Sequence, residues 1–494
     1  MNNRRLPVIL LVLVFSGACA AAIGSGRIPW RVANDQIVYH EAAIREFARQ
    51  WPHFDLQDYL SVTTPGYHLL LAGLVRVGAE STSALQGASA LIGAALVGVA
   101  AFFAGRPPRE DRAPGAAAVE PWAWSGALLA APLAASMYVF QSAAWILPDN
   151  LAWLLVALIL AICLRSAPTA GRLVLTGVLL AALVFVRQNH LWVAGAIWAW
   201  AWFHGVPLSP EAQKQRLLAL MGQAVQAEKA SREGSMPPEA PGLSEDGRLG
   251  RLVLAAVVTA PAFAIIAWFA WQWGGLTPER YRGFHQGMNP ATPAFVLAVM
   301  GAAGLFFGPL FARPLLNLVR LHWPVLLAGA VIAGVAASFT PTTFSQEAGR
   351  WTGLWNLTKS SPVIGHTSLV IFGLAVIGGV LLVTLMLALP RRAAGVLVIS
   401  LMGFTAAQSM NAQCWQRYVE PLVLILLALA GGMVLPHHPP RRAAWLSVVL
   451  LTALFAAMDV QAMRGAPKIG NAVAPDVQPM GGPYVPRHLR APTP

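Results

Sequence analysis

The sequence predicts an all-α, polytopic membrane protein, and three observations support this fold class. Of the 494 residues, 56% are hydrophobic and only 11% are charged, whereas an average soluble domain has roughly 25% charged residues. The mean hydropathy is +0.58. Apolar runs of about 20 residues, the length that crosses a bilayer as a helix, recur along the chain. We therefore expect a single transmembrane domain over residues 1–494.

Thirteen apolar segments approach or exceed the length needed to span a membrane, and those between 121 and 204 are the shortest. They cover residues 6–24, 82–104, 121–138, 148–165, 171–186, 190–204, 252–273, 292–312, 322–339, 366–389, 393–410, 418–435 and 443–463. These segments predict a bundle of about 11–13 transmembrane helices. The stretch 66–79 is apolar but too short to span, which is typical of an interfacial or re-entrant helix.

The distribution of basic residues predicts the orientation. When the N-terminus is placed in the cytoplasm, every loop on that side is basic, as the positive-inside rule expects. The residues concerned are Arg106, Arg109, Arg112, Arg165, Arg172, Arg313, Arg320, Arg391, Arg392, Arg441 and Arg442, with further basic residues in a hydrophilic cytoplasmic loop, 205–251. The net charge of +13 is therefore attributed to basic loops that orient the helices in the membrane, and not to nucleic-acid binding. Residues 464–494 are then an outer C-terminal tail.

The first apolar segment has two interpretations. Arg4 and Arg5, the apolar run from Leu6 and the small residues at 18–22 resemble a secretory signal peptide. We favour an uncleaved first helix, because many more spanning segments follow it.

Residues 25–81 form a long first outer loop. Within it, Ala43, Ile44, Phe47 and Trp51 recur at helical spacing with charges between them, which predicts an amphipathic helix on the membrane surface. Asp35 precedes this helix. Its carboxylate can act as a general base toward a sugar hydroxyl or can cap the helix N-terminus.

Ionisable residues in the short outer loops are candidates for function. Five arginines lie there against the orientation rule: Arg187, Arg280, Arg282, Arg350 and Arg417. The guanidinium group matches phosphate geometry through its planar fork of donors. The alternative for each one is contact with lipid headgroups, but the set of five favours a phosphate-bearing ligand. Asp149, in "LPDN", begins a helix and is expected to cap it.

No pattern in the sequence predicts a metal or other cofactor. The outer histidines His40, His68, His190 and His285 lack the spacing of a helical zinc site. The cysteines Cys19, Cys163 and Cys414 are far apart and form no disulfide or metal framework. No nucleotide-binding loop or nucleophile elbow is present. The outer tryptophans are mostly explained by an interfacial belt, from which one or two can stack on a sugar ring; they are Trp51, Trp145, Trp192, Trp273, Trp351, Trp355 and Trp415.

Four motifs between residues 30 and 300 occur in the order found in one known family. They are "NDQIVYH" from Asn34, "LQDYLSVTTPGYHLL" from Leu56, "VRQNHLWV" from Val186 and "WGGLTPERYRGFHQGMNPA" from Trp273. With these motifs the chain resembles the dolichyl-phosphate-glucose α-1,2-glucosyltransferases, which add the last glucose to the N-glycan lipid precursor. They are members of the GT-C superfamily of multi-helix membrane glycosyltransferases. Two departures stand out: Gln36 replaces the second acidic residue of the family, and Tyr39 replaces its histidine, with His40 adjacent.

The resemblance implies an inverting transfer of a hexose, on the outer face, from a polyprenyl-phosphate sugar of dolichyl or undecaprenyl type to a glycan acceptor. Asp35 would be the general base. The implied lipid-phosphate site contains Arg187, Gln188, Asn189, Arg280, His285 and Arg417. The implied wall of the acceptor site contains Tyr39, His40, Thr63, Thr64 and Tyr67. The Arg- and Ala-rich composition favours a bacterial inner membrane, with the site facing the periplasm.

Three alternatives remain open from the sequence. Thr63 and Thr64 either contact substrate or cap the following helix. The chain can be a transporter or flippase for a lipid-linked or anionic substrate, which would use the same outer arginines and show broken helices in matched halves. It can also be a non-catalytic subunit of an envelope-polysaccharide system.

Overall fold

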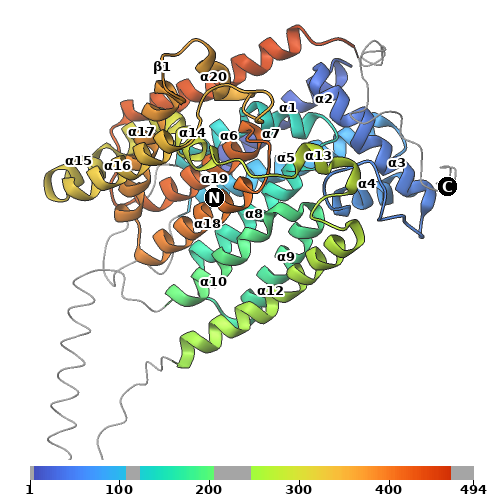
Figure 1. Ribbon diagram of the computed structural model, residues 1–494, viewed down its shortest axis with the longest axis horizontal. Helices are drawn as coiled ribbons and strands as arrows, with labels where there is room; N and C mark the ends of the chain where they lie inside the picture. Colours follow the sequence, from blue (N-terminus) through green and yellow to red (C-terminus); the bar gives the residue numbers. More distant parts are fainter. Residues whose placement is uncertain (1–4, 107–122, 205–245, 469–494) are drawn as a thin grey trace, which may run out of the picture.

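The computed structural model describes residues 5–106, 123–204 and 246–468, and most of these residues are helical (Figure 1). The only two strands in these ranges, β1 (Val363–Ile364) and β2 (Thr367–Ser368), form one antiparallel pair. Most of the expected cytoplasmic loop 205–251 and of the tail 464–494 lies outside the described residues. The all-α prediction is therefore confirmed for the part of the chain that the structure describes.

The longer helices follow one another along the chain as the apolar segments predict. They are α1 (Arg5–Gly24), α5 (Thr82–Ala104), α6 (Ser125–Ala134), α7 (Met137–Ala144), α8 (Asp149–Arg165), α9 (Ala170–Val186), α10 (Val193–Phe203), α12 (Asp246–Trp273), α14 (Thr292–Phe307), α15 (Ala312–Leu321), α16 (Trp323–Phe339), α17 (Leu369–Ala388), α18 (Arg391–Ser409), α19 (Gln416–Val434) and α20 (Trp445–Arg464).

Short helical pieces occupy the connections between the long helices. They are α2 (Trp30–Asn34), the π-helical turn η1 (Asp35–His40), α3 (Glu41–Gln50), α4 (Gly66–Arg76), η2 (Gln188–Trp192), η3 (Glu279–Tyr281), α13 (Arg282–His285), η4 (Gly308–Phe311), η5 (Gly353–Lys359) and η6 (Arg442–Ala444).

Seven helices within the described ranges are long and apolar enough to cross a membrane. They are Arg5–Gly24, Thr82–Ala104, Gly247–Trp273, Thr292–Leu321, Leu369–Ala388, Gln416–Val434 and Arg442–Arg464. Several other expected spans correspond to shorter helices, such as α9 and α16 with 17 residues each. A multi-pass membrane protein is thus the class that the fold supports, while the number of 11–13 spans remains a prediction.

One expected span has different bounds in the structure. The sequence predicted a single helix over 121–138, but α6 ends at Ala134 and α7 begins at Met137, and the axes of these two helices are bent by 73° at the break between them. Pro132 lies inside α6 and cannot donate a helical hydrogen bond. Just beyond it, the Ser136 hydroxyl donates to Glu420 of α19 at 2.6 Å. Both features favour the break over a continuous helix.

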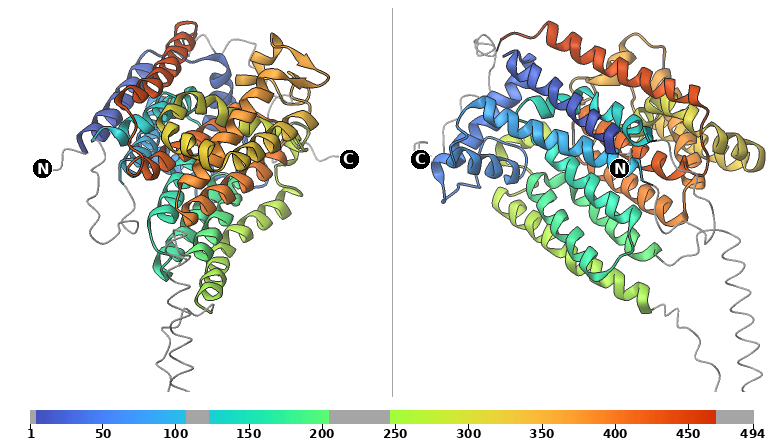
Figure 2. Two further views of the ribbon diagram at one scale, coloured as in Figure 1. Left: turned by 90° about the vertical axis from the view of Figure 1, so that its left-hand side faces the viewer. Right: turned by 180° about the vertical axis from the view of Figure 1, so that it is seen from behind.

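The bundle is built around α5 and α19. Helix α5 packs against α1, α6, α7, α8 and α19. Helix α19 is almost wholly buried, whereas only 22% of the apolar window is buried in each of α1, α12 and α20. Figure 2 shows α12 and α20 along opposite edges of the bundle. An apolar exposed edge is what a helix in contact with lipid requires.

The first loop folds back onto the bundle as α2, η1, α3 and α4. The expected amphipathic helix is α3, and Ala43, Ile44 and Phe47 on its apolar face are buried. They pack toward α4 and the rest of the protein. The sequence instead predicted that this apolar face lies on the membrane surface. Trp51, at the end of the same pattern, is 47% exposed. The segment 66–79 forms the short helix α4, as its length predicted.

The "TTPG" sequence brings α4 close to the end of α9. A Cβ atom added at Gly66 would lie 2.6 Å from the carbonyl oxygen of Phe185, too close for any ordinary contact. Thr64 strengthens this approach, because its hydroxyl donates to the carbonyl of Val184 at 2.7 Å. Glycine is thus required at position 66 by the neighbouring backbone.

The close approach at Gly66 predicts a steric cost for any side chain at this position. We expect Gly66→Ala to lower the free energy of unfolding by about 1–3 kcal/mol, because the backbones of α4 and α9 must separate. The measurement is thermal unfolding of the purified chain in lipid nanodiscs. Gly73→Ala is the matched control, since it lies in the same helix with no atom within 4 Å of the added Cβ. Equal stability of the two variants would contradict the packing described here.

Candidate functional site

Four charged side chains from four distant segments meet at one end of the bundle. Asp35 lies in η1, Asp149 in the first turn of α8, Arg187 directly after α9, and Arg417 in the first turn of α19. Arg417 donates from Nη1 to Oδ2 of Asp35 at 2.7 Å, and its Nη2 lies 3.7 Å from Oδ2 of Asp149. Arg187 donates to Oδ1 of Asp149. We call these four residues the charge cluster.

The two halves of the charge cluster differ in accessibility. The side chains of Arg187 and Asp149 are 8% and 10% exposed, whereas those of Arg417 and Asp35 are 27% and 28% exposed. Burial lowers the pKa of Arg187 to about 10, so this guanidinium remains charged at neutral pH. The Asp149–Arg187 pair is therefore an internal support, and the Asp35–Arg417 pair is the part that a ligand can reach.

Helix ends favour two of these four charges and disfavour one. Asp149 at the start of α8 and Arg187 at the end of α9 carry charges that the helix macrodipole stabilises. Arg417 is a cation in the first turn of α19, where the dipole opposes it. Two carboxylates beside Arg417 compensate for this unfavourable position. The ring of Tyr418 adds cation–π contacts, with its centroid 5.0 Å from Cζ of Arg187 and 5.3 Å from Cζ of Arg417.

The structure corrects the expected capping role of Asp149. The N-cap of α8 is Pro148, and no side chain caps this helix. The Asp149 carboxylate turns instead toward Arg187 and Arg417. Asp35 is not a cap either, because α2, η1 and α3 are continuous in sequence and the N-cap residue of η1 is Asn34. Both carboxylates are thus committed to arginines and not to helix ends.

Gln36 holds the turn that carries Asp35. Its Oε1 accepts hydrogen bonds from Nε2 of Gln86 at 3.2 Å and from the backbone amide of Ile146 at 3.3 Å. Its Nε2 donates to Oε2 of Glu41 at 3.3 Å. Ile146 precedes Asp149 by three residues, so a single buried amide links the two segments that carry the cluster's carboxylates.

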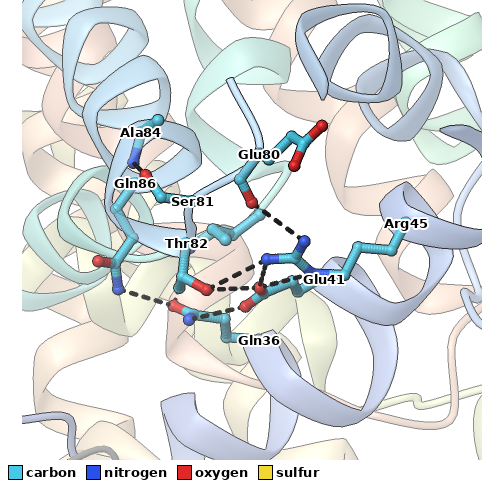
Figure 3. Close-up of polar contacts among 9 residues, drawn as sticks. Gln36, Glu41, Arg45, Glu80, Ser81, Thr82, Ala84 and Gln86 are labelled. Atoms are coloured by element: carbon cyan, nitrogen blue, oxygen red, sulfur yellow. Dashed lines mark hydrogen bonds and ion pairs between the residues drawn. The ribbon is translucent and has the colours of Figure 1, made fainter. Parts of the chain in front are cut away.

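Figure 3 shows how this turn is tied to the start of α5. Oε1 of Glu41 accepts from the hydroxyl of Thr82 at 2.7 Å and from Nη2 of Arg45 at 2.5 Å. Arg45 also donates to the carbonyl of Glu80 at 3.1 Å. The position of η1, and with it Asp35, is therefore fixed by hydrogen bonds on both sides.

His40 and His68 form a buried pair behind η1. Nδ1 of His40 lies 2.9 Å from Nε2 of His68, and the rings stack with their centroids 5.2 Å apart. One ring must donate this hydrogen bond and the other accept it, so both rings can be neutral but not both protonated. Burial, followed by the charges of Arg417 and Arg187, lowers the pKa of His40 to about 3. Burial and His40 also lower the pKa of His68.

The predicted wall residues Thr63, Thr64 and Tyr67 are all buried and bonded to the protein. The backbone amide of Thr64 donates to Oε1 of Gln188 at 3.0 Å, and the Thr63 hydroxyl lies 3.0 Å from that of Ser61. The Tyr67 hydroxyl lies 2.7 Å from the Ser89 hydroxyl of α5. Neither threonine caps α4, whose N-cap is Pro65 without a side-chain bond. Gln188 therefore acts as a clamp on the "TTPG" loop.

Gln188 also reaches a third segment of the site end of the bundle. Its Nε2 donates to the carbonyl of Val62 at 2.8 Å and to that of Leu276 at 3.2 Å. The neighbouring Asn189 has a buried Oδ1 without a hydrogen-bond partner among the described residues. The "RQN" motif thus contributes one arginine to the charge cluster and one amide to the support of its loops.

The remaining predicted residues lie in the loop after α12. Arg280 belongs to η3 next to Tyr281, whose ring packs edge-on against that of Tyr39 with centroids 6.1 Å apart. His285 lies close enough to the cluster to be affected by it: burial, then Arg417 and Arg187, lowers its pKa to about 4. His285 is consequently neutral near pH 7 and offers a hydrogen bond, not a charge, to a ligand.

Two of the five outer arginines serve the local backbone instead of the cluster. Arg282 donates to the carbonyl of Trp273 at the end of α12. Arg350 donates from Nε to the carbonyl of Thr343 at 3.0 Å. In residues 5–106, 123–204 and 246–468, no group of three or more His, Cys, Asp or Glu side chains is arranged to hold a metal ion.

Comparisons of the chain with models of known protein families, with curated proteins and with solved structures return no match. The fold and the charge cluster therefore define the class, a helical multi-pass membrane protein with an ionic site at one end of its bundle. The resemblance to the glucosyltransferases rests on the four sequence motifs alone.

The buried support of the charge cluster predicts a large stability effect. We expect Asp149→Asn to lower the free energy of unfolding by about 3–5 kcal/mol, because Arg187 would keep a buried charge without its main partner. Denaturant or thermal unfolding in nanodiscs measures the loss. Glu46→Gln is the control, since it removes the partner of the largely exposed Arg49, a pair of a kind that contributes about 0–1 kcal/mol. A loss at Asp149 no larger than that at Glu46 would refute the supporting role.

The histidine pair predicts sensitivity to acid. The unfolded chain protonates His40 near its ordinary pKa of about 6.5, whereas the folded chain resists until about pH 3. Between these values the unfolded state binds more protons, so stability falls as the pH is lowered, by up to about 1.4 kcal/mol per pH unit from this residue. We expect His40→Gln to reduce the loss of Tm between about pH 7.5 and pH 5. His53→Gln, at an exposed position of the same loop, should leave that loss unchanged. An unaltered acid response in His40→Gln would count against the buried pair as its source.

Proposed function

We propose that this chain is a membrane glycosyltransferase, which transfers a hexose from a polyprenyl-phosphate sugar to a lipid-linked or cell-envelope glycan. The observation that carries the proposal is the contact of Asp35 with Arg417 at 2.7 Å, supported by the buried Asp149–Arg187 pair. A carboxylate can accept the proton of an attacking hydroxyl. Two guanidinium groups beside it can stabilise the negative charge that grows on a leaving phosphate.

In the proposed reaction, Asp35 removes the proton from an acceptor hydroxyl as its oxygen attacks the anomeric carbon of the donor sugar. The bond between that carbon and the phosphate oxygen breaks, and the lipid phosphate leaves with the electron pair. A single displacement of this kind inverts the anomeric configuration. Arg417, which donates to Asp35, and Arg187, which faces the same Tyr418 ring as Arg417, can receive the phosphate charge.

The motif resemblance supports glucose as the hexose and an α-1,2 linkage as the product. The distribution of basic loops supports a periplasmic or lumenal site, because Asp35, Arg187 and Arg417 belong to loops opposite the basic ones. A bacterial chain would use an undecaprenyl-type carrier, and a eukaryotic one a dolichyl-type carrier.

A transporter or flippase for a lipid-linked anion is the alternative function. One observation favours it, namely the 73° break between α6 and α7. Transporters with broken helices usually have such breaks in corresponding positions of two halves. Among the described helices only this one pair shows a bend of that kind, so the matching break in a second half is not seen there. This difference from the transporter pattern favours the enzyme.

The proposed base predicts a severe loss of activity when its charge is removed. We expect Asp35→Asn to reduce sugar transfer by at least about 10²–10⁴-fold, because an amide cannot accept the proton. The measurement is transfer of labelled glucose from polyprenyl-phosphate glucose to a lipid-linked glycan by the purified full-length chain in nanodiscs. Unfolding curves of the same preparation establish that the variant is folded.

Asp55→Asn is the matched control for this experiment. Asp55 lies in the same loop, and its Oδ1 accepts from the backbone amides of Gln57 and Asp58. We expect it to retain most of the wild-type activity. Substantial transfer by Asp35→Asn would remove Asp35 as the base. Movement of a labelled lipid across the bilayer without any transfer by the wild type would favour the transporter.

A further inference from the structure

Five aromatic side chains from three separate segments gather beside the charge cluster. Trp415 is at their centre: its ring centroid lies 5.4 Å from that of Tyr418, 5.5 Å from Trp351, 5.9 Å from Phe284 and 6.3 Å from His285. We call these five residues the aromatic cluster. Nothing in the proposed chemistry of Asp35 and the arginines requires it.

The backbones that carry the aromatic cluster are joined by hydrogen bonds. The amide of Ala412 donates to the carbonyl of His285 at 3.2 Å, and that of Cys414 donates to the carbonyl of Gly349 at 3.1 Å. The side chain of Asn289 donates to the carbonyls of both Ala348 and Ala412, at 2.9 and 2.8 Å. These bonds unite the loops before α14, before α17 and before α19. The rings are therefore held on a preformed platform, which lowers the entropy cost of binding a ligand.

The three tryptophans of this region differ in burial and in hydrogen bonding. Trp355 is fully buried, stacks on Phe295 with centroids 4.4 Å apart, and donates from Nε1 to the carbonyl of Cys414 at 2.7 Å. Trp415 and Trp351 are only half-buried. The Nε1 atom of Trp415 is shielded from water but has no hydrogen-bond partner among the described residues.

Two further polar atoms near these rings are also buried and also lack a hydrogen-bond partner among the described residues. Oε1 of Gln413 and Oγ1 of Thr352 are buried without a hydrogen-bond partner in the described parts of the chain. A buried polar group without a partner costs free energy, which a ligand can recover by supplying the missing hydrogen bond. One donor, one acceptor and one hydroxyl thus lie within a few residues of the half-buried tryptophans Trp415 and Trp351.

The aromatic cluster also contacts the reactive half of the charge cluster. Cζ of Arg417 lies 5.7 Å from the ring centroid of Trp415 and 5.3 Å from that of Tyr418, while the same guanidinium donates to Asp35. A molecule on the rings would therefore lie next to a phosphate held by Arg417.

We propose that the aromatic cluster is a binding site for a hexose ring, with Trp415 stacking on the apolar C–H face of the sugar. Sugar rings combine such a face with a rim of hydroxyls, and the rim would satisfy Trp415, Gln413 and Thr352. This inference rests on the proposed function for its place in the reaction. The hexose can belong to the donor lipid or to the acceptor glycan, which share the chemistry that the site recognises.

The test measures binding by isothermal titration calorimetry with the full-length chain in nanodiscs. Three probes separate the possibilities: a short-chain prenyl-phosphate glucose, the same prenyl phosphate without sugar, and a free glucose oligosaccharide. We expect Trp415→Ala to weaken binding of at least one sugar-containing probe by about tenfold, the effect of losing a well-placed aromatic contact. Binding of the sugar-free prenyl phosphate should not change.

Two further variants make the result specific. Trp415→Phe keeps a ring but loses the indole N–H, so it should retain part of the affinity that Trp415→Ala loses. Trp51→Ala removes an exposed tryptophan that packs on Phe54 outside the cluster, and it should leave all three affinities unchanged. Unfolding curves identify a variant that fails to fold.

The outcomes distinguish this inference from the proposed function. A loss with prenyl-phosphate glucose alone assigns the site to the donor, and a loss with the oligosaccharide alone assigns it to the acceptor. An equal loss for the sugar-free probe, or no loss for any probe, overturns the sugar site. If the wild type fails to bind the sugar-free prenyl phosphate but binds the oligosaccharide through Trp415, the phosphate role fails and the sugar site stands.

Discussion

The pairing of Arg417 and Arg187 with Asp149 is the interaction on which the site end of the bundle depends. Both guanidinium groups lie at the ends of apolar helices, where an unpaired charge would be costly. Asp149 meets both of them, and it thereby connects α8, α9 and α19. A buried ion pair adds little to stability relative to apolar packing, but the loss of one partner is severe. The cluster therefore specifies how these helices meet more than it strengthens their packing.

The hydrogen bonds of Gln36 explain why a neutral residue is suitable beside Asp35. Its amide accepts from Gln86 and Ile146 at one end and donates to the Glu41 carboxylate at the other. A carboxylate at position 36 would have no proton to donate and would face the charge of Glu41. Gln36 is thus matched by the surroundings that this chain provides. It leaves Asp35 as the acidic residue of the motif that contacts an arginine.

The sequence predicted the helical, multi-pass class because a membrane helix carries its own signal in the length and composition of an apolar run. Through the orientation rule the sequence also singled out five outer arginines, of which Arg187 and Arg417 lie in the charge cluster. It failed for Asp149 because the local pattern "LPDN" is equally that of a helix start, and the partners lie 38 and 268 positions later. Contacts of that separation leave no trace in local spacing.

The apolar face of α3 and the break between α6 and α7 show the same limit. Periodicity reveals that Ala43, Ile44 and Phe47 share a face, but not whether protein or lipid covers it. Likewise, the run 121–138 is mostly apolar, and the break depends partly on a hydrogen bond from Ser136 to Glu420, 284 positions away. In both cases the deciding partner belongs to another helix.

The balance of charge in the cluster bears on how a phosphate would bind under the proposed function. Two carboxylates and two guanidinium groups sum to zero, so an added phosphate brings excess negative charge and must compete for an arginine. The more exposed Asp35–Arg417 pair is the weaker of the two, because water screens it, while the buried Asp149–Arg187 pair resists separation. Phosphate would therefore take Arg417 first. The exchange would release the carboxylate of Asp35 at the moment when an acceptor hydroxyl needs a base, while Asp149 keeps Arg187 in place.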